Sequence, residues 1–178
     1  LFDFPPGTAW RYSNANYHVL GAVVEKVTGQ PLAEAAASLI FRPLELTRTA
    51  FDTSAAVVRG RVDGYAPVEG APGSFEHPAP LDVAQAGGAG AMRSCTTDLC
   101  RWHHALFSNR LFEARWTQLM TAPGRLRDGR VSGSRRFSPE DAAYGDTQYG
   151  MGLLLPPAGK AGRTVLHYGF IRGFSAML

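Results

Sequence analysis

The chain has 178 residues, of which 45% are hydrophobic and 19% charged, with a formal net charge of +3 at pH 7. This length suits one domain with a buried core, and the composition is ordinary for a globular protein. No run of residues approaches the roughly 18 apolar residues that a membrane-spanning helix needs. Residues 1–6 lack the pattern of a signal peptide, which says nothing about export if the natural N-terminus lies upstream.

A loop and two helices are predicted first. Residues 5–8, Pro-Pro-Gly-Thr, form a turn signature. A helix should follow, because Asn14 or Asn16 can cap it and Gly29 can end it. Its apolar stripe has three- and four-residue spacing and consists of Tyr17, Leu20, Val24 and Val27. A second helix should run from about Pro31 to Ile40.

The middle of the chain predicts loops around one further long helix. A short helical turn at residues 42–46 precedes an extended piece at 49–51, and the Pro-, Gly- and Ala-rich residues 65–80 predict an irregular loop. Thr96 or Thr97 can cap the long helix, and Asp98 lies in its first turn, where the helix dipole favours a negative charge. Its core stripe consists of Leu99, Trp102, Leu106 and Phe107.

The last third predicts a short helix and an antiparallel sheet. Trp116, Leu119 and Met120 indicate the helix. Strand-like pieces follow at residues 149–155, 164–167 and 174–178, and the glycines between them suit hairpin turns. Because the last piece ends at the terminus of the sequence, we expect the natural protein to continue beyond it.

Arginines gather in one stretch that also contains Gly and Ser. They are Arg125, Arg127, Arg130, Arg135 and Arg136. A nucleic-acid site usually needs a basic face with interleaved aromatic side chains, and only Phe137 lies nearby. We therefore expect a solvated, mobile loop and no nucleic-acid partner.

The cysteines and paired histidines do not predict a metal site. Cys95 and Cys100 would lie on different faces of a helix, which places them poorly for a mutual disulfide, and we expect both to be packing residues. His103 and His104 are adjacent, so their side chains diverge by about 100° on a helix and cannot share a metal ion. We expect one or both at the surface.

Several motifs resemble one family when they are taken together and in order. Tyr12-Ser13-Asn14 lies within residues 6–17, and the segments at residues 20–29 and 43–49 follow it. Later segments fit the same pattern: residues 88–99, 149–153, and 167–174 with His167-Tyr168-Gly169-Phe170. The chain thus resembles the serine β-lactamase-related family of class C β-lactamases, D-alanyl-D-alanine carboxypeptidases and related esterases over nearly its whole length.

The resemblance implies the penicillin-recognising fold. This is an α/β (α+β) fold in which helices flank an antiparallel sheet and a second region is mainly helical. Residues 1–178 would form a single partial domain, with helices and loops over 1–143 and C-terminal strands over 144–178. The first strands, the nucleophile helix and the closing strand and helix would be missing, so we expect the fold to be incomplete at both ends.

One part of the family pattern is not in the sequence. The family's nucleophile is a serine followed three residues later by lysine, on a helix. The two lysines here are Lys26 and Lys160, and Val23 and Pro157 stand three residues before them. We therefore expect the nucleophile to lie outside these residues, and this chain alone to be inactive.

The resemblance implies acyl transfer through a serine ester, with Tyr12, Asn14 and His167 as catalytic residues. Tyr12 would share the base role with the missing lysine; a free tyrosine has a pKa near 10, so it needs nearby cations to act as a base near neutrality. Asn14 would donate its amide to a substrate carbonyl, or only cap the helix. His167 would orient a substrate carboxylate and, if charged, stabilise the phenolate of Tyr12. Alternatively, Tyr12 is only a hydrogen-bonded aromatic residue, and His167 is an ordinary histidine at the end of a strand.

Two further residues are implied in substrate binding. Gly169 would permit close approach along a strand edge, and the Phe170 N–H would supply half of an oxyanion hole. Tyr168 stands where the family usually has a small residue, which leaves substrate size open. Ser175 lies in a near match to G-x-S-x-G, but Met177 replaces the last glycine and no helix follows.

For the full-length protein, the resemblance implies serine-dependent hydrolysis of an amide or ester. The substrate would be a D-amino-acid peptide, a β-lactam or a small ester, with no metal or organic cofactor. The alternative is a non-catalytic ligand-binding remnant of the same fold, and a truncated sequence of an intact gene would explain the missing motif most simply. The residues define neither oligomeric state nor compartment, although the resemblance is compatible with an extracytoplasmic location.

Overall fold

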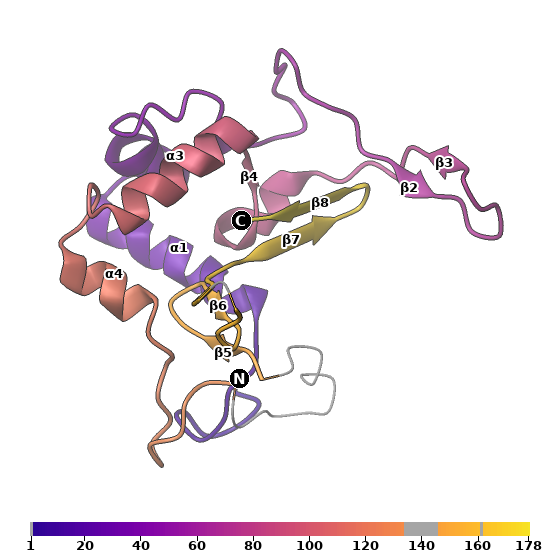
Figure 1. The fold of residues 1–178 in the computed structure, drawn as a ribbon. Coiled ribbons are helices and arrows are strands. Elements are labelled where there is room, and N and C mark those ends of the chain that lie inside the picture. Colours follow the sequence, from indigo (N-terminus) through magenta and orange to yellow (C-terminus); the bar gives the residue numbers. More distant parts are fainter. Residues whose placement is uncertain (1, 134–145, 161) are drawn as a thin grey trace. The chain divides into compact units, whose positions relative to one another are not determined.

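The computed structural model describes residues 2–133, 146–160 and 162–178. The chain divides into two compact units. The first consists of Leu1–Ser13 and His104–His167, and the second of Asn14–His103 and Tyr168–Leu178. Both units combine helices with short two-stranded antiparallel pairings, as Figure 1 shows.

The second unit begins with helix α1, Asn14–Thr28. Gly29 follows with φ +68°, and its N–H donates to the Glu25 carbonyl at 2.9 Å, so the predicted glycine stop is confirmed. Asn16 lies inside the helix and therefore does not cap it.

The apolar stripe of α1 is covered only in part. Tyr17 and Val24 are half-buried, whereas Leu20 and Val27 are 54% and 79% exposed. The buried residue of the helix is Gly21, which faces Gly88 of the 3₁₀ segment η2, Val83–Ala89. A Cβ on Gly88 would lie 2.4 Å from the Tyr17 carbonyl oxygen, so a glycine is required for this close backbone contact.

The predicted second helix forms with a change of pitch. It consists of α2, Leu32–Ala36, and one π-helical turn, η1, Ala37–Phe41, and Pro31 directly precedes it. Turns at residues 42–46 bury Leu44 and Leu46. The extended piece follows as β1, Ala50–Phe51, which pairs with β4, Met92–Arg93.

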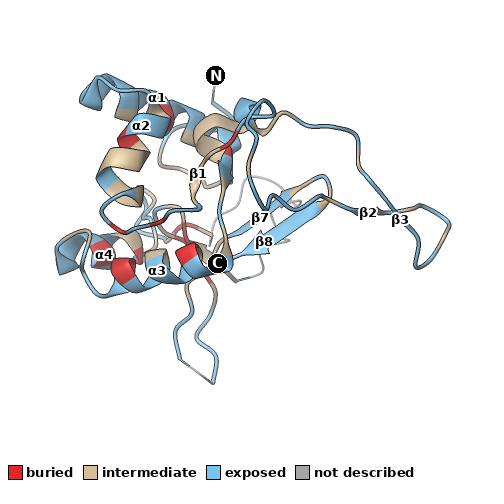
Figure 2. Cartoon of the chain, turned by 90° about the horizontal axis from the view of Figure 1, so that it is seen from above, coloured by how far each residue is buried: buried red, intermediate tan, exposed pale blue. Residues whose placement is uncertain are grey.

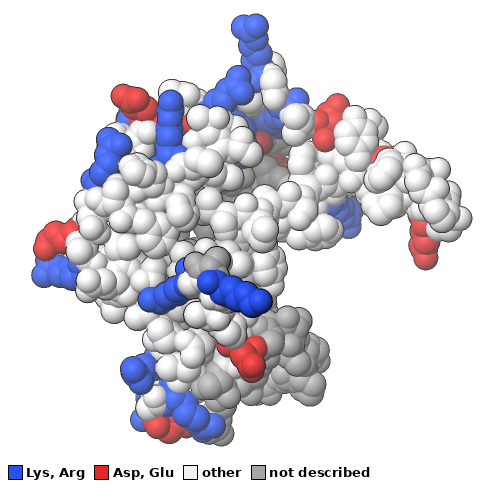
Figure 3. Space-filling view, viewed as in Figure 1, with Lys and Arg blue, Asp and Glu red and all other residues white. Residues whose placement is uncertain are grey.

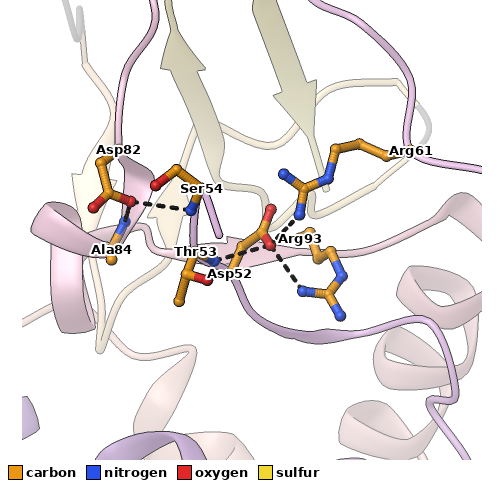
Figure 4. Close-up of polar contacts among 7 residues, drawn as sticks. All are labelled: Asp52, Thr53, Ser54, Arg61, Asp82, Ala84 and Arg93. Atoms are coloured by element: carbon orange, nitrogen blue, oxygen red, sulfur yellow. Dashed lines mark hydrogen bonds and ion pairs between the residues drawn. The ribbon is translucent and has the colours of Figure 1, made fainter. Parts of the chain in front are cut away.

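A buried carboxylate joins this strand pair to the loop after it. Asp52 is 9% exposed and accepts hydrogen bonds from Arg61 at 2.5 Å and Arg93 at 2.9 Å (Figure 4). In the same view, Asp82 accepts from the main-chain N–H of Ser54 at 3.3 Å. Two guanidinium groups thus compensate the negative charge of the buried Asp52 carboxylate.

Two hairpins complete the second unit. β2, Ala66–Pro67, pairs with β3, Phe75–Glu76, so the expectation of irregular loop over residues 65–80 is wrong at this point. β7, Tyr168–Ile171, pairs with β8, Phe174–Met177, around a two-residue turn. The predicted strand at 174–178 is thus confirmed, whereas the strand before it lies four residues later than residues 164–167. Figure 2 shows β7 and β8 mostly in the colour of exposed residues.

Helix α3, Thr96–Phe107, is close to its predicted bounds. It begins at Thr96, so the capping position is Cys95 and the prediction of Thr96 or Thr97 as its cap is wrong by one or two residues. Asp98 is 2% exposed and accepts from the Arg48 N–H at 2.8 Å and the Thr49 hydroxyl at 2.9 Å. The first-turn carboxylate therefore also anchors the segment that leads into β1.

The cysteines and histidines of α3 differ from one another in burial. Cys95 is half-buried and Cys100 is exposed, both as free thiols, so the expectation that both pack in a core is wrong for Cys100. His103 and His104 are exposed, as predicted. Within the described ranges, no group of three His, Cys, Asp or Glu side chains is placed to hold a metal ion, and no helix is long and apolar enough to cross a membrane.

The first unit contains helix α4, Ala114–Met120, which confirms the predicted short helix. The buried Thr117 hydroxyl donates to the Leu106 carbonyl at 3.1 Å. β5, Gln148–Tyr149, pairs with β6, Leu154–Leu155. The single strand predicted at 149–155 is therefore wrong: the chain turns at residues 150–153 and forms a hairpin there. Of the predicted strand at 164–167, a single bridge from Leu166 to Leu154 forms.

Candidate active site

Tyr12 and His167 lie together in the first unit. Their ring centroids are 6.0 Å apart and their planes are inclined by 43°. Both residues are half-buried. Folding thus brings together two of the three predicted catalytic residues, one from each end of the chain.

A third ring lies against both of them. The Tyr149 centroid is 6.1 Å from that of Tyr12 and 6.4 Å from that of His167, with interplanar angles of 73° and 74°. Trp10 lies 5.3 Å from Tyr149 on the same measure. We call Trp10, Tyr12, Tyr149 and His167 the aromatic cluster. Tyr149 is its most buried member, at 9% exposure, and nearly perpendicular ring pairs of this kind are favourable.

Sequence reasoning missed Tyr149 and Trp10 as members of the site. Tyr149 begins a family-like segment, Tyr149-Gly150-Met151-Gly152, and Trp10 stands two residues before Tyr12. Those positions were the available signals. Neither side chain belongs to an expected catalytic motif, so nothing local distinguished them from core aromatics.

The backbone of Tyr149 is held by one buried hydroxyl. The Ser132 hydroxyl donates to the Tyr149 carbonyl and accepts from the Tyr149 N–H at 3.2 Å. The Gly124 N–H donates to the same carbonyl at 3.0 Å. Ser132 is 4% exposed, so these bonds form without competition from water.

Ser132 and Gly124 belong to a tight hydrogen-bonded turn at residues 124–133. Within it, the Leu126 N–H donates to the Arg130 carbonyl at 2.8 Å, and the Arg127 N–H donates to the Gly7 carbonyl at 2.8 Å. The arginine stretch was expected to be a solvated, mobile loop. Arg125, Arg127 and Arg130 are exposed, as expected, while Arg135 and Arg136 lie outside the described residues. The described part also bonds to Tyr149 and to the segment that leads into Tyr12.

One pKa in this turn is shifted. A side-chain hydrogen bond to Asp128 raises the pKa of Arg130 above its ordinary value. The pair is an exposed ion pair, and such pairs contribute little to stability.

Short pairings position His167. The Leu154 N–H donates to the Leu166 carbonyl at 2.8 Å, and the Leu166 N–H donates back to the Leu154 carbonyl at 3.1 Å. Leu154 is 3% exposed and pairs on its other side with Tyr149. His167 directly follows Leu166. The pairing of Leu166 with Leu154, and of Leu154 with Tyr149, therefore connects His167 to Tyr149, against which the His167 ring packs.

The other three predicted residues belong to the second unit. Asn14 is the exposed first residue of α1, while Gly169 and Phe170 lie on β7. A Cβ on Gly169 would meet no atom within 4 Å, so the strand is open at this point. The structure thus brings Tyr12 and His167 together, whereas Asn14, Gly169 and Phe170 belong to the other unit.

The register of β7 and β8 defines the direction of the Phe170 backbone. The turn at residues 172–173 is flanked by the pair Ile171–Phe174, which is hydrogen-bonded in two-residue hairpins. Pairs alternate along an antiparallel ladder, so Phe170, opposite Ser175, belongs to a non-hydrogen-bonded pair. Its N–H consequently points away from β8, to the outer edge of β7, and its side chain is 80% exposed.

Charged side chains do not gather in one place on the face drawn in Figure 3. Lys and Arg lie at separate positions there, and Asp or Glu side chains stand beside several of them.

Comparisons with known proteins agree with the resemblance in the sequence. The family model described as Beta-lactamase matches residues 2–178. Penicillin-binding protein 4* of Bacillus subtilis (strain 168) is 28% identical over 98% of the chain, and esterase EstB of Burkholderia gladioli is 51% identical over 49 residues. A D-stereospecific amidohydrolase from Streptomyces sp. superposes with a TM-score of 0.72 and 31% identity over 97% of the chain.

The chain spans only part of these relatives. It covers 38% of penicillin-binding protein 4* and 46% of the amidohydrolase. Its short antiparallel strands and helices follow the fold of penicillin-binding and β-lactamase-like proteins, which is the predicted α/β class. Since the family model matches nearly every residue, the chain belongs to the beta-lactamase family.

Proposed function

We propose that the full-length protein is a serine hydrolase that acts on amide or ester substrates through an acyl-enzyme, with its nucleophile outside these 178 residues. The observation that carries this proposal is the 6.0 Å separation of the Tyr12 and His167 rings. Family membership supports it, because the relatives include proteins named as an esterase and an amidohydrolase.

In the proposed reaction, the serine hydroxyl attacks the substrate carbonyl and its proton passes to Tyr12. The carbon–nitrogen or carbon–oxygen bond of the substrate then breaks, and the leaving group takes up a proton. Water hydrolyses the resulting ester. Tyr12 can act in this way if cationic groups stabilise its phenolate, and protonated His167 is one such group within reach of its ring.

Asn14, Gly169 and Phe170 bind substrate in this proposal. The Asn14 amide donates to a carbonyl of the acyl part, and its position two residues after Tyr12 supports that role. The Phe170 N–H donates to the developing oxyanion, which its direction away from β8 supports. Gly169 leaves the strand edge open to a ligand backbone.

The substrate classes proposed are a D-amino-acid peptide, a β-lactam and a small ester. A penicillin-binding protein, a D-stereospecific amidohydrolase and an esterase among the relatives support these three.

The test is covalent labelling of the full-length gene product with a fluorescent penicillin and with a fluorophosphonate, read by intact mass. We expect one adduct on a serine of an S-x-x-K motif, and no adduct on the 178-residue chain alone. A matched Ser175→Ala variant should label normally, because Ser175 lies exposed on β8. Labelling of Ser13 or Ser175 would overturn the proposed architecture.

A second candidate function is ligand binding without catalysis. It is the alternative if the full-length protein also lacks S-x-x-K, which these 178 residues do not contain: Val23 and Pro157 stand three residues before the two lysines. If the full-length product lacks the motif and takes no label, but binds penicillin or a D-amino-acid peptide reversibly in calorimetry, this candidate replaces the hydrolase.

A further inference from the structure

We propose that Tyr149 is a positioning residue, whose buried ring keeps Tyr12 and His167 in their mutual arrangement for the reaction. This inference rests on the proposed function, because the arrangement matters for catalysis only if Tyr12 and His167 take part in it. It adds a residue to which the sequence motifs assigned no role.

The first argument is geometric. The Tyr149 ring lies at nearly equal distances from the two others, 6.1 Å from Tyr12 and 6.4 Å from His167, and nearly perpendicular to both. Tyr12 and His167 are 6.0 Å from each other, so the three centroids form an almost equilateral triangle. A shift of either reacting ring toward the position of Tyr149 is blocked by that ring.

The second argument concerns rigidity. Tyr149 is 9% exposed, whereas Tyr12 and His167 are only half-buried. Ser132 bonds both main-chain polar groups of Tyr149, and Gly124 bonds its carbonyl a second time. We therefore expect Tyr149 to be the least mobile side chain of the cluster, and both half-buried rings pack against it.

The third argument is that the same turn reaches both sides of the cluster. Residues 124–133 hold Tyr149 through Ser132, and Arg127 donates from the same turn to Gly7, five residues before Tyr12. A support with rotamers locked by packing and hydrogen bonds is what a precise site requires, since a displacement of about 1 Å can cost about a hundredfold in rate.

The experiment uses three variants of the full-length protein and follows ester or amide hydrolysis. Tyr149→Leu removes the ring, Tyr149→Phe keeps it, and Leu153→Ala is a matched control, because Leu153 has the same 9% exposure but no ring. We expect Tyr149→Leu to lower kcat about tenfold to a hundredfold with KM changed less than about threefold. Tyr149→Phe should restore most of kcat, and Leu153→Ala should alter thermal stability without this loss in kcat.

A double-mutant cycle separates positioning from general weakening of the fold. In a Tyr12→Phe background, Tyr149→Leu should lower kcat by no more than about threefold, because the residue through which it acts is already disabled. Equal losses in both backgrounds, or a Leu153→Ala loss as large as that of Tyr149→Leu, would overturn the proposal.

A measurement independent of activity keeps this inference distinct from the proposed hydrolase. In NMR spectra of the full-length protein, ring-proton contacts between Tyr12 and His167 should be present in the wild type and in Tyr149→Phe, and lost or weakened in Tyr149→Leu. If these contacts persist unchanged in Tyr149→Leu, Tyr149 does not position the pair, even in an active enzyme. If they are lost while the wild type proves inactive, the proposed function fails and the positioning role stands.

Discussion

The hydroxyl of Ser132 satisfies both main-chain polar groups of Tyr149, donating to its carbonyl and accepting from its N–H. One buried side chain thus bonds the main-chain groups of Tyr149, in addition to the pairing of Tyr149 with Leu154. The ring of Tyr149 in turn packs near those of Tyr12 and His167. Ser132 therefore supports the aromatic cluster through the backbone of Tyr149.

Ser132→Ala should destabilise the protein by about 1–3 kcal/mol. The Tyr149 carbonyl keeps its bond from Gly124, but its N–H loses its partner in a buried environment. Urea unfolding measures the difference. The control is Ser175→Ala, an exposed serine on β8, which should change the free energy of unfolding by less than about 0.5 kcal/mol. Equal effects of the two changes would show that the Ser132 bonds do not contribute.

Tyr12→Phe in the full-length protein should lower kcat by about 10²–10⁴-fold with little change in KM. The change removes the oxygen that accepts the proton of the serine hydroxyl in the proposed reaction, while the ring remains. Steady-state kinetics on an activated ester measures this. Tyr65→Phe is the matched loss of a hydroxyl from an exposed tyrosine that stacks on His77, and it should keep full activity. If Tyr12→Phe raises KM as much as it lowers kcat/KM, Tyr12 binds substrate and takes no part in proton transfer.

Asp98→Ala should cost about 1.5–3 kcal/mol of stability. The carboxylate is 2% exposed, and its loss leaves the Arg48 N–H and the Thr49 hydroxyl without this acceptor. Asp98→Asn keeps an oxygen acceptor and should cost less. Thermal unfolding of both variants tests whether Asp98→Ala is the less stable of the two. The control is Asp63→Ala, a change at an exposed aspartate. An Asn variant as unstable as the Ala variant would indicate that the charge itself, rather than the acceptor, is required.

Gly150→Ala should destabilise the first unit by about 1–3 kcal/mol through overpacking. A Cβ at this position would lie 2.3 Å from the Met120 carbonyl oxygen and 3.1 Å from that of Ala122. Gly159→Ala is the control, because a Cβ there meets no atom within 4 Å and the residue is exposed. Denaturant unfolding should separate the two variants clearly, and equal stability would mean that the backbone near Met120 moves aside at no cost.

Helix bounds followed from local signals in the sequence. Gly29 ends α1, because a residue in the left-handed conformation bonds to the carbonyls of the last helical turn. The spacing of their apolar residues, three or four apart, likewise predicted α3 and α4. The strands were placed less well. β7 begins at Tyr168 and not at Thr164, because pairing with β8 around the turn at residues 172–173 decides which residues are strand.

The sequence by itself determined the family, because its motifs stand in the family's order along the chain, and those motifs predicted Tyr12 and His167 as site residues. Only the tertiary structure decided that these two rings meet, and that Tyr149, Ser132 and Asp98 hold their surroundings in place. The physical reason is range. Caps, turns and helix periodicity act over three or four neighbouring residues, whereas the bonds of Ser132 to Tyr149 and of Asp98 to Arg48 join segments that become neighbours only when the chain folds.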